Sequence, residues 1–572
     1  MRLCDIAVRR AAQTPDRVAY RFIDGALNER ALVTYGQLDQ RARELGGTLA
    51  AWTRSGARVI IALDSGPEFV LCLFACLYTG RVAVPALASR RANAAWDRLL
   101  SLMRDARPEL VIVESAAIAA RLANETAARG CRIETFGEFA AAVAAELKPL
   151  ATSGEPELAL LQYTSGSTGD PKGVMLTEAS LQANLDAIRI CFGHSEDSHM
   201  ISWLPMHHDM GLIGCVLEPF YVGFPVTLLS ALDVVQRPAR WLQAIGRYRG
   251  TVSGAPPFAY RACLDRVRDD QLAGVDLSSW RVAFVGAERV PDALLRRFGE
   301  RFAPHGLSPD AVRACYGLAE ATLLVSFMSK PARLCPPSIA QADGEHSGPA
   351  MASCGECIPM HELICVDTHG RLCGEGECGE IWVRGPSVAA GYYGRTQENE
   401  RVFGAYCEGR GPYLRTGDRG LLRDNQVYVV GRIKDLVIVR GRKFAPEDIE
   451  ATVATSHAFV AGAIGAAFSL AREDGEVLVV VQEVTRSAMR ELDLDEACAA
   501  IREQLTSVHG VSPAAIALTA PGSVPRTTSG KVQRGRCREL FMQQQLALVG
   551  GTHSPAAGKH APASDVRGLG EA

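Results

Sequence analysis

Residues 163–173 of the chain, YTSGSTGDPKG, are the stretch on which the interpretation of the fold depends. They follow an apolar run at 158–161 that predicts a buried strand. Glycines and small hydroxyl residues let backbone N–H groups approach phosphate oxygens, and Lys172 adds a point charge. It is not a P-loop of the usual kind, because Pro171 stands where glycine is needed and Gly173 where Ser or Thr would bind magnesium. A flexible surface loop is the alternative for such a Gly/Ser/Thr run.

Similar apolar runs occur before and after this loop and alternate with amphipathic stretches. They lie at 59–63, 110–113, 158–161 and 282–285. Strands that are apolar throughout are typical of parallel sheets covered on both faces by helices. We therefore predict an α/β fold with mostly parallel sheets for the N-terminal part.

A second domain is expected to begin near residues 431–435. Apolar runs at 436–439 and 477–481 predict strands, and a later 3.6-residue periodicity predicts a helix ending at Gly510. This is enough for a small α+β domain of about a hundred residues. From about residue 550 the chain is rich in Gly, Ala, Ser and Pro, which predicts a disordered tail. The expected boundaries are 1–432 for the N-terminal body, 433–545 for the C-terminal domain and 546–572 for the tail.

Length and composition restrict the class of protein. The chain has 572 residues, 61 Lys+Arg against 64 Asp+Glu, and 48% hydrophobic residues, as in soluble globular proteins. The near-neutral balance argues against a nucleic-acid partner held by bulk charge. The most apolar run, at 70–77, is shorter than the roughly 20 residues of a membrane span and is interpreted as a buried helix or strand. The N-terminus has no signal-peptide character, and the cysteine usage indicates a reducing, cytoplasmic compartment.

Four later segments are motifs that occur, together with this loop and in this order, in one superfamily of enzymes. They are CYGLAEAT at 315–322, LRTGD at 414–418, GRIKD at 431–435 and PRTTSGK at 525–531. Together with the loop they resemble the motifs of the adenylate-forming superfamily of acyl-CoA synthetases, luciferases and peptide-synthetase adenylation domains. The resemblance spans nearly the whole chain.

Two further features resemble one subfamily, the fatty acyl-AMP ligases. Residues 202–214 read SWLPMHHDMGLIG, and Ala319 precedes Glu320 where most of the superfamily has Thr. Peptide-synthetase domains carry an Asp near the equivalent of His208 to hold a substrate amine. Here only Asp209 is close, and it belongs to the HDMG run, so an amino acid substrate is not expected.

The resemblance implies a large N-terminal body of several subdomains, a mobile C-terminal domain, and ATP and Mg²⁺ as cofactors. A fatty acid would be activated to acyl-AMP with release of pyrophosphate. It would then pass to the phosphopantetheine thiol of an acyl carrier protein or of a polyketide or peptide synthase carrier domain. An acyl-CoA synthetase and a catalytically degenerate nucleotide-binding protein are the alternatives.

The resemblance also implies roles for individual residues. The residues implied to hold the β- and γ-phosphates are Thr164, Ser165, Gly166, Ser167, Thr168, Gly169 and Lys172. Those implied for the rest of the nucleotide are Gly286, Ala287, Glu288, Tyr316, Gly317, Thr322, Asp418 and Arg432. Glu320, with Thr164, would coordinate Mg²⁺, and Lys531 would bridge the carboxylate and the α-phosphate. His208 would gate the acyl or AMP pocket, and Lys434 would be the hinge between domains.

Several of these residues have ordinary structural alternatives. Asp418 could be a turn residue, and Lys531 a solvated loop lysine. A metal site at residues 207–209 is not expected, because adjacent histidines usually point apart.

Two other stretches leave questions open. Four cysteines read C-x₂-C-x₁₅-C-x₄-C, close to zinc-ribbon spacing, although structural thiols are favoured: Cys354, Cys357, Cys373 and Cys378. The Pro-, Ser- and Gly-rich stretch from about residue 330 to 352 lies where fatty acyl-AMP ligases carry an insertion.

Overall fold

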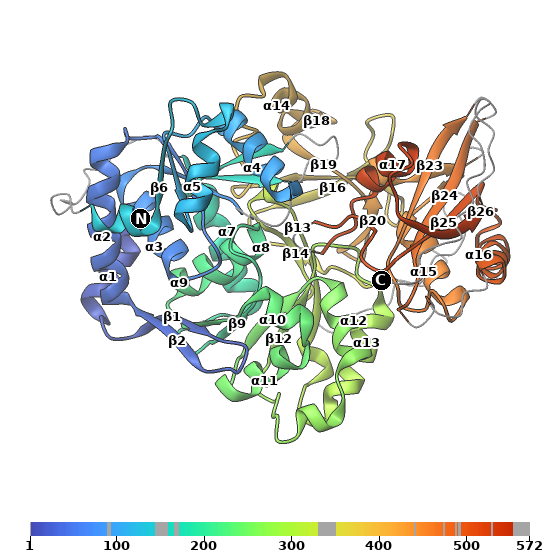
Figure 1. The fold of residues 1–572 in the computed structure, drawn as a ribbon, viewed down its shortest axis with the longest axis horizontal. Helices are drawn as coiled ribbons and strands as arrows, with labels where there is room; N and C mark the ends of the chain where they lie inside the picture. The colour runs from blue at the N-terminus through green and yellow to red at the C-terminus, as the bar shows by residue number, and fades with distance from the viewer. Residues whose placement is uncertain are drawn as a thin grey trace, which may run out of the picture. The chain divides into compact units, whose positions relative to one another are not determined.

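The computed structural model describes residues 2–87, 93–142, 158–164, 171–329, 351–439, 442–472, 475–486, 489, 494–527 and 530–552 (Figure 1). The chain forms two compact units. The first comprises Met1–Asp435 with Arg526–Lys531, and the second comprises Leu436–Pro525 with Val532–Ala572. The stretch in which an insertion was expected falls almost wholly outside the described residues.

One sheet of the first unit carries the loop at 163–173. Its order is β6 (Arg132–Thr135), β5 (Leu110–Val113), β3 (Arg58–Ala62), β4 (Val82–Pro85), β7 (Leu158–Thr164) and β8 (Lys172–Thr177). All neighbouring pairs are parallel except β7–β8. The apolar run at 70–77 lies in helix α3 (Pro67–Thr79), whose side chains from Phe69 onward are almost all buried. A helix that is apolar all round belongs in a core.

A second, larger sheet of the first unit places the other motifs. Its order is β15 (Glu356–Cys357), β14 (Leu324–Phe327), β13 (Val312–Gly317), β12 (Val282–Val285), β11 (Val252–Ala255), β9 (Met200–Ser202), β10 (Val226–Leu228), β1 (Val18–Ile23) and β2 (Glu29–Thr34). The pairs from β13 through β1 are parallel. The predicted mostly parallel α/β body is therefore confirmed.

The remaining sheet of the first unit is antiparallel. It contains β16 (Glu362–Val366), β17 (Gly379–Arg384), β19 (Arg410–Arg423) and β18 (Ala405–Cys407), and β20 (Gln426–Arg432) pairs with β19. The β19–β20 register places Asp418 opposite Arg432.

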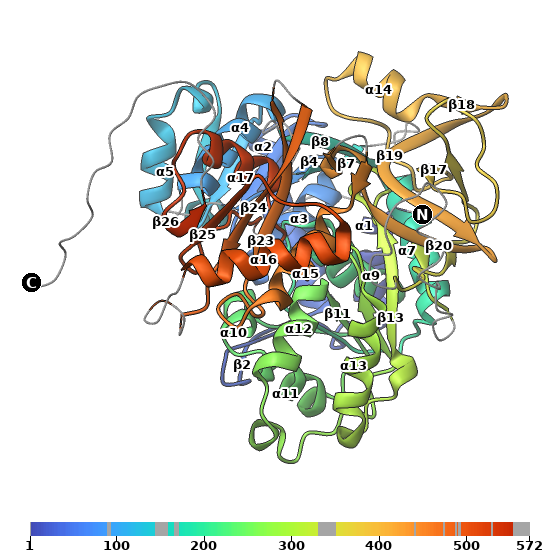
Figure 2. The same ribbon diagram turned by 90° about the vertical axis from the view of Figure 1, so that its right-hand side faces the viewer.

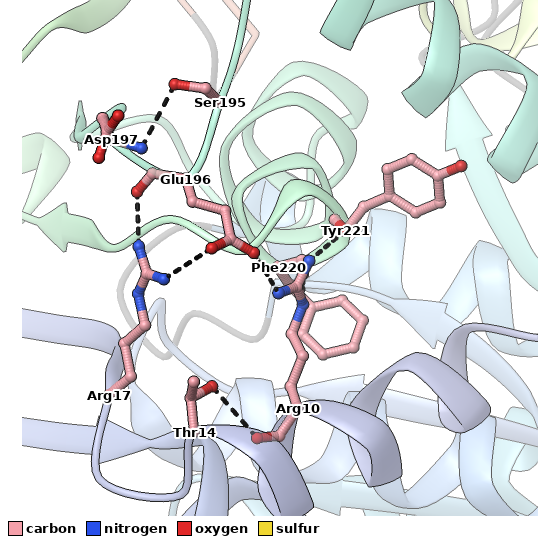
Figure 3. A network of polar contacts seen from close by, with 8 residues as sticks. All are labelled: Arg10, Thr14, Arg17, Ser195, Glu196, Asp197, Phe220 and Tyr221. Carbon is pink, nitrogen blue, oxygen red and sulfur yellow. Dashed lines mark hydrogen bonds and ion pairs between the residues drawn. The ribbon is translucent and has the colours of Figure 1, made fainter.

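Arg10 is one of the residues that attach the N-terminal helix to the body (Figure 3). Arg10 of α1 (Leu3–Gln13) donates from Nε and Nη2 to the carbonyls of Phe220 and Tyr221, at 3.0 and 2.8 Å. These carbonyls end α9 (Glu218–Val222), where no helical N–H remains to bind them. Gly223 follows with φ +100°, and a Cβ there would lie 2.0 Å from Arg10 Nη1. The glycine thus leaves room for the guanidinium.

The second unit is a small α+β domain, as predicted (Figure 2). Its main sheet has the order β23 (Gly465–Arg472), β24 (Gly475–Glu483), β25 (Ala515–Thr519) and β26 (Leu548–Thr552), with a hairpin of β21 (Val437–Val439) and β22 (Arg442–Phe444). Its helices are α15 (Pro446–Ser456), α16 (Leu494–His509) and α17 (Arg534–Met542). α16 buries Ile501 and Leu505 and ends before Gly510, which has φ +62°.

The expected disordered tail is wrong at its start. Residues 548–552 form β26, which pairs antiparallel with β25 and covers its edge. The gain in backbone hydrogen bonds along an otherwise open edge outweighs the weak strand propensity of Gly550 and Gly551. Residues 553–572 lie outside the described part.

Among the described residues, no helix is long and apolar enough to cross a membrane.

Candidate active site

The stretch expected to bind phosphate connects two antiparallel strands. Thr164 ends β7 and faces Lys172 at the start of β8, so the sheet ladder holds both ends of the loop. A P-loop, in contrast, leads from a strand into a helix. Ser165, Gly166, Ser167, Thr168 and Gly169 lie outside the described residues, so their predicted roles stay predictions. Lys172 Nζ contacts Glu398 Oε1 and lies 5.1 Å from the ring centre of Tyr392.

Three predicted nucleotide residues meet at the antiparallel sheet. Asp418 is buried. Its Oδ2 accepts a hydrogen bond from Tyr316 Oη at 2.7 Å, and its Oδ1 forms an ion pair with Arg432 Nε at 2.7 Å. Because Asp418 lies within strand β19 and is buried, the alternative of a turn residue is wrong. Burial and the Asp418 charge raise the pKa of Tyr316 well above its usual value, so the phenol stays a donor. The Asp418 charge also raises the pKa of Arg432.

Residues 286–288 leave the carboxyl end of β12 beside the end of β13. A Cβ on Gly286 would lie 2.6 Å from Cys315 Sγ, and Ala287 has φ +70°. The chain thus turns away from the sheet next to Cys315, the residue before Tyr316. The carboxyl ends of parallel strands are where open α/β sheets bind ligands. This position agrees with the adenine contact expected of Gly286, Ala287 and Glu288, which stays a prediction.

The magnesium candidate, Glu320, is fixed by a distant segment of chain. Its carbonyl accepts from Ala389 N at 2.9 Å, and its Oε1 accepts from Tyr392 Oη at 2.8 Å. Within the described ranges, no group of three or more His, Cys, Asp or Glu residues could hold a metal. A single carboxylate nevertheless suits Mg²⁺, which commonly takes one or two carboxylates and completes its shell with substrate phosphates and water. The oxygen donors of Glu320 and Thr164 are of the right kind.

Thr322 does not have a free side chain for the nucleotide. It is fully buried, and its Oγ1 donates to the Ser387 carbonyl at 2.6 Å. Its φ of +69° is unusual for a β-branched residue. The hydroxyl thus supports the turn that carries Glu320, and the predicted role of Thr322 toward the nucleotide stays a prediction.

The rings of the two adjacent histidines lie close together, tilted at 43° to each other, and the expectation that they point apart is wrong. Their ring centres are 4.5 Å apart. Burial lowers the pKa of His207 to about 4 and that of His208 well below its usual value, so both rings are neutral at neutral pH. Gly211, in helix α8 (Asp209–Leu212), packs tightly on the turn before them, because a Cβ there would lie 2.2 Å from the Pro205 carbonyl oxygen.

Lys531 belongs to a short segment, Arg526–Lys531, that groups with the first unit and not with the domain around it in sequence. Thr527 N donates to the Lys531 carbonyl at 2.8 Å, and Lys531 N donates back to Thr527 Oγ1 at 3.0 Å. Burial raises the pKa of Asp209, and the positive charge of Lys531 opposes that shift. Lys531 is thus part-buried near the histidine run, and it is not a solvated loop lysine.

Lys434 lies in the turn Ile433–Asp435, immediately before the second unit begins. This position is consistent with a hinge, whose motion remains a prediction.

The four cysteines with ribbon-like spacing are not brought together as a metal site. Burial raises the pKa of Cys354 and of Cys357 to about 12.

Sequence reasoning missed the residues that support Glu320 and Lys172: Ser387, Tyr392, Glu398 and Asn399. Their only local signal is GYY at 391–393, a glycine followed by two tyrosines between a strand and a helix.

Comparison with known proteins shows the family to which the chain belongs. A model of the AMP-binding enzyme family matches residues 8–393, and a model of the AMP domain of Disco-interacting protein 2-like proteins matches residues 434–550. This chain belongs to the AMP-binding enzyme family, and it is a ligase.

Similar proteins within this family are ligases that act on fatty acids. The medium-chain-fatty-acid–[acyl-carrier-protein] ligase JamA of Moorena producens is 36% identical over 95% of each chain. The long-chain-fatty-acid–AMP ligase FadD28 of Mycobacterium tuberculosis is 34% identical over 90% of this chain and 93% of its own.

Solved structures agree with these relatives. A structure from work on the fatty acyl-adenylate ligases of E. coli and L. pneumophila matches with a TM-score of 0.85 at 31% identity, over 95% of this chain and 98% of its own. The L. pneumophila ligase in complex with acyl adenylate and pyrophosphate matches with a TM-score of 0.72 at 31% identity, over 96% and 98%.

Proposed function

We propose that this ligase converts a medium- or long-chain fatty acid and ATP to acyl-AMP and pyrophosphate. It then transfers the acyl group to the phosphopantetheine thiol of an acyl carrier protein or carrier domain. The observation that carries the nucleotide half is the cluster of three motif residues in which Tyr316 and Arg432 converge on the buried carboxylate of Asp418. The acyl and acceptor halves are supported by the relatives, which act on fatty acids and on a carrier protein.

In the first step the fatty acid carboxylate oxygen attacks the α-phosphorus, and the bond to the bridging oxygen of pyrophosphate breaks. The barrier is set by charge crowding, so the protein contributes position and cations. Asp418 accepts from the ribose hydroxyls, Arg432 braces ribose and phosphate, and Lys172 binds the outer phosphates. Lys531 stabilises the charge that develops between the carboxylate and the α-phosphate.

Mg²⁺, held by Glu320 with Thr164, would neutralise phosphate charge when bound. In the second step the thiol loses its proton, its sulfur attacks the acyl carbonyl, and AMP leaves with the bonding electron pair. His208, neutral and part-buried, would line the entrance to the acyl or AMP pocket. The free cysteines of the described residues suit a reducing compartment such as the cytoplasm.

The test is an acceptor assay. Purified protein is given ATP, Mg²⁺ and radiolabelled acids of graded chain length, with either CoA or a holo carrier protein as acceptor. We expect acyl-AMP to accumulate without acceptor, little acyl-CoA to form, and the carrier protein to become labelled. Efficient acyl-CoA synthesis would move the protein to the CoA-ligase class. Absence of any acyl-AMP would favour the degenerate nucleotide-binding alternative.

A further inference from the structure

Residues 387–393 connect the two parts of the site that handle the phosphates and the metal. On one side, Ala389 N donates to the Glu320 carbonyl at 2.9 Å. On the other side, main-chain hydrogen bonds join this segment to β8, which begins at Lys172. They are Ala390 N to Met175 O at 3.0 Å, Met175 N to Gly391 O at 2.8 Å and Tyr393 N to Gly173 O at 2.8 Å. The backbones that carry Glu320 and Lys172 are therefore fixed relative to each other.

Tyr392 is the side chain of this segment that reaches both residues. Its hydroxyl donates to Glu320 Oε1 at 2.8 Å, and its ring centre lies 5.1 Å from Lys172 Nζ. The ring is buried and packs edge-on against Phe403 at 5.2 Å between ring centres. The tyrosine thus contacts an anion through its donor and a cation through its π face, as its electrostatics favour.

Helix α14 (Thr396–Phe403) holds Tyr392 in this place. Asn399 brackets its backbone, accepting from Tyr392 N at 2.6 Å and donating to the Tyr392 carbonyl at 2.9 Å. The neighbouring Glu398 contacts the Lys172 ammonium group. One turn of helix therefore supports both the tyrosine and the lysine.

We propose that Tyr392 is a positioning residue for the metal carboxylate. This inference rests on the proposed function, in which Glu320 binds Mg²⁺. The tyrosine hydroxyl uses one lone pair of Oε1 and holds the carboxylate in a single orientation, so that its remaining lone pairs face the cation. Hydrogen-bond partners of a metal-binding carboxylate commonly change metal affinity by about tenfold or more.

The matched variants are Tyr392→Phe and Tyr393→Phe. Each removes one hydroxyl from adjacent tyrosines and keeps the ring. Binding of Mn²⁺, a spectroscopic substitute for Mg²⁺, is followed by electron paramagnetic resonance with the full chain and a non-hydrolysable ATP analogue. We expect Tyr392→Phe to weaken Mn²⁺ binding about tenfold and Tyr393→Phe to leave it unchanged. When EDTA removes the metal, the affinity for the ATP analogue should be the same for the unmodified protein and both variants.

A double-mutant cycle with Glu320→Gln separates positioning from a general structural effect. If Tyr392 acts through Glu320, Tyr392→Phe will have no further effect in the Glu320→Gln background. An equal loss in both backgrounds, or an equal loss from Tyr393→Phe, would overturn the positioning role. If Glu320→Gln binds Mn²⁺ as tightly as the unmodified protein, the proposed metal role of Glu320 is wrong and the inference falls with it. Formation of acyl-AMP by the unmodified protein, measured in parallel, tests the proposed function independently.

Discussion

Asp418 and Arg432 face each other across the β19–β20 pairing, with Arg432 Nε 2.7 Å from Asp418 Oδ1. The two residues come from separate motifs, and the sheet register makes them partners. The ion pair and the hydrogen bond from Tyr316 orient the carboxylate before any nucleotide binds. Such preorganisation lowers the cost of binding.

Asp418→Asn tests this site with little change in side-chain size. Hydrogen bonds to a charged group are worth about 1.5–3 kcal/mol, so we expect the KM for ATP to rise about tenfold or more. The measurement is ATP–pyrophosphate exchange at varied ATP. Tyr316→Phe, which removes a donor to Asp418 but leaves the carboxylate in place, should have a smaller effect. Unchanged ATP kinetics in Asp418→Asn would contradict the ribose role.

Lys531→Ala separates the two half-reactions. Loss of one preorganised charge at the transition state should slow acyl-AMP formation by about 10²- to 10³-fold. Transfer from pre-formed acyl-AMP to a holo carrier protein should suffer much less, because the predicted rotation of the C-terminal domain takes Lys531 out of the site before that step. Each half-reaction is measured in single turnover, with the exposed Lys443→Ala as the control. Equal losses in both steps would argue against a role confined to adenylation.

Gly211→Ala tests the packing of the histidine run. The added Cβ would lie 2.2 Å from the Pro205 carbonyl oxygen, so the turn that carries His207 and His208 must move. Overpacking of this kind costs about 1–3 kcal/mol, and we expect lower stability and slower adenylation. Gly137→Ala is the control, because its Cβ meets nothing closer than Thr135 Oγ1 at 4.0 Å. Denaturant unfolding and pyrophosphate exchange provide the two measurements.

A buried pair away from the site predicts a pH dependence of stability. His194 Nδ1 lies 2.9 Å from Glu218 Oε1, and both side chains are inaccessible. Burial lowers the pKa of His194 to about 3 and raises the pKa of Glu218 well above 4.5, so the pair is a neutral hydrogen bond and not an ion pair. In the folded state one proton stays on Glu218, whereas in the unfolded chain this carboxyl ionises above pH 4.5.

The sign follows from the extra proton bound by the folded state. A raised carboxyl pKa favours folding at low pH and loses that contribution as pH rises. Relative to Glu218→Gln, the unmodified protein should therefore lose about 1.4 kcal/mol of stability per pH unit above 4.5, until Glu218 ionises. Denaturant midpoints of both proteins at pH 5.5, 7 and 8.5, chosen to span about three units, measure this difference. A difference that does not change with pH would show that Glu218 is ionised in the fold.

Local sequence determined the class of fold and most of the motif residues. The apolar runs at 110–113 and 282–285 coincide with β5 and β12, because strands buried on both faces need apolar residues throughout. The run at 70–77 was ambiguous from its composition, and packing made it a helix. Asp418, Tyr316 and Arg432 were identifiable one by one, since each belongs to a motif of its own.

The tertiary structure decided how those residues are paired and supported. Tyr316 and Asp418 are 102 positions apart in the chain, and Lys172 and Glu398 are 226 apart. No local pattern specifies such a partner, because the first contact exists only when two sheets have packed and the second only when a strand and a helix have packed. For the same reason Thr322, a motif residue, donates its hydroxyl hydrogen bond to the Ser387 carbonyl. Tyr392, which belongs to none of the motifs, donates a hydrogen bond to Glu320. β26 likewise formed in a Gly-rich stretch because β25 offered it an open edge, which composition alone does not record.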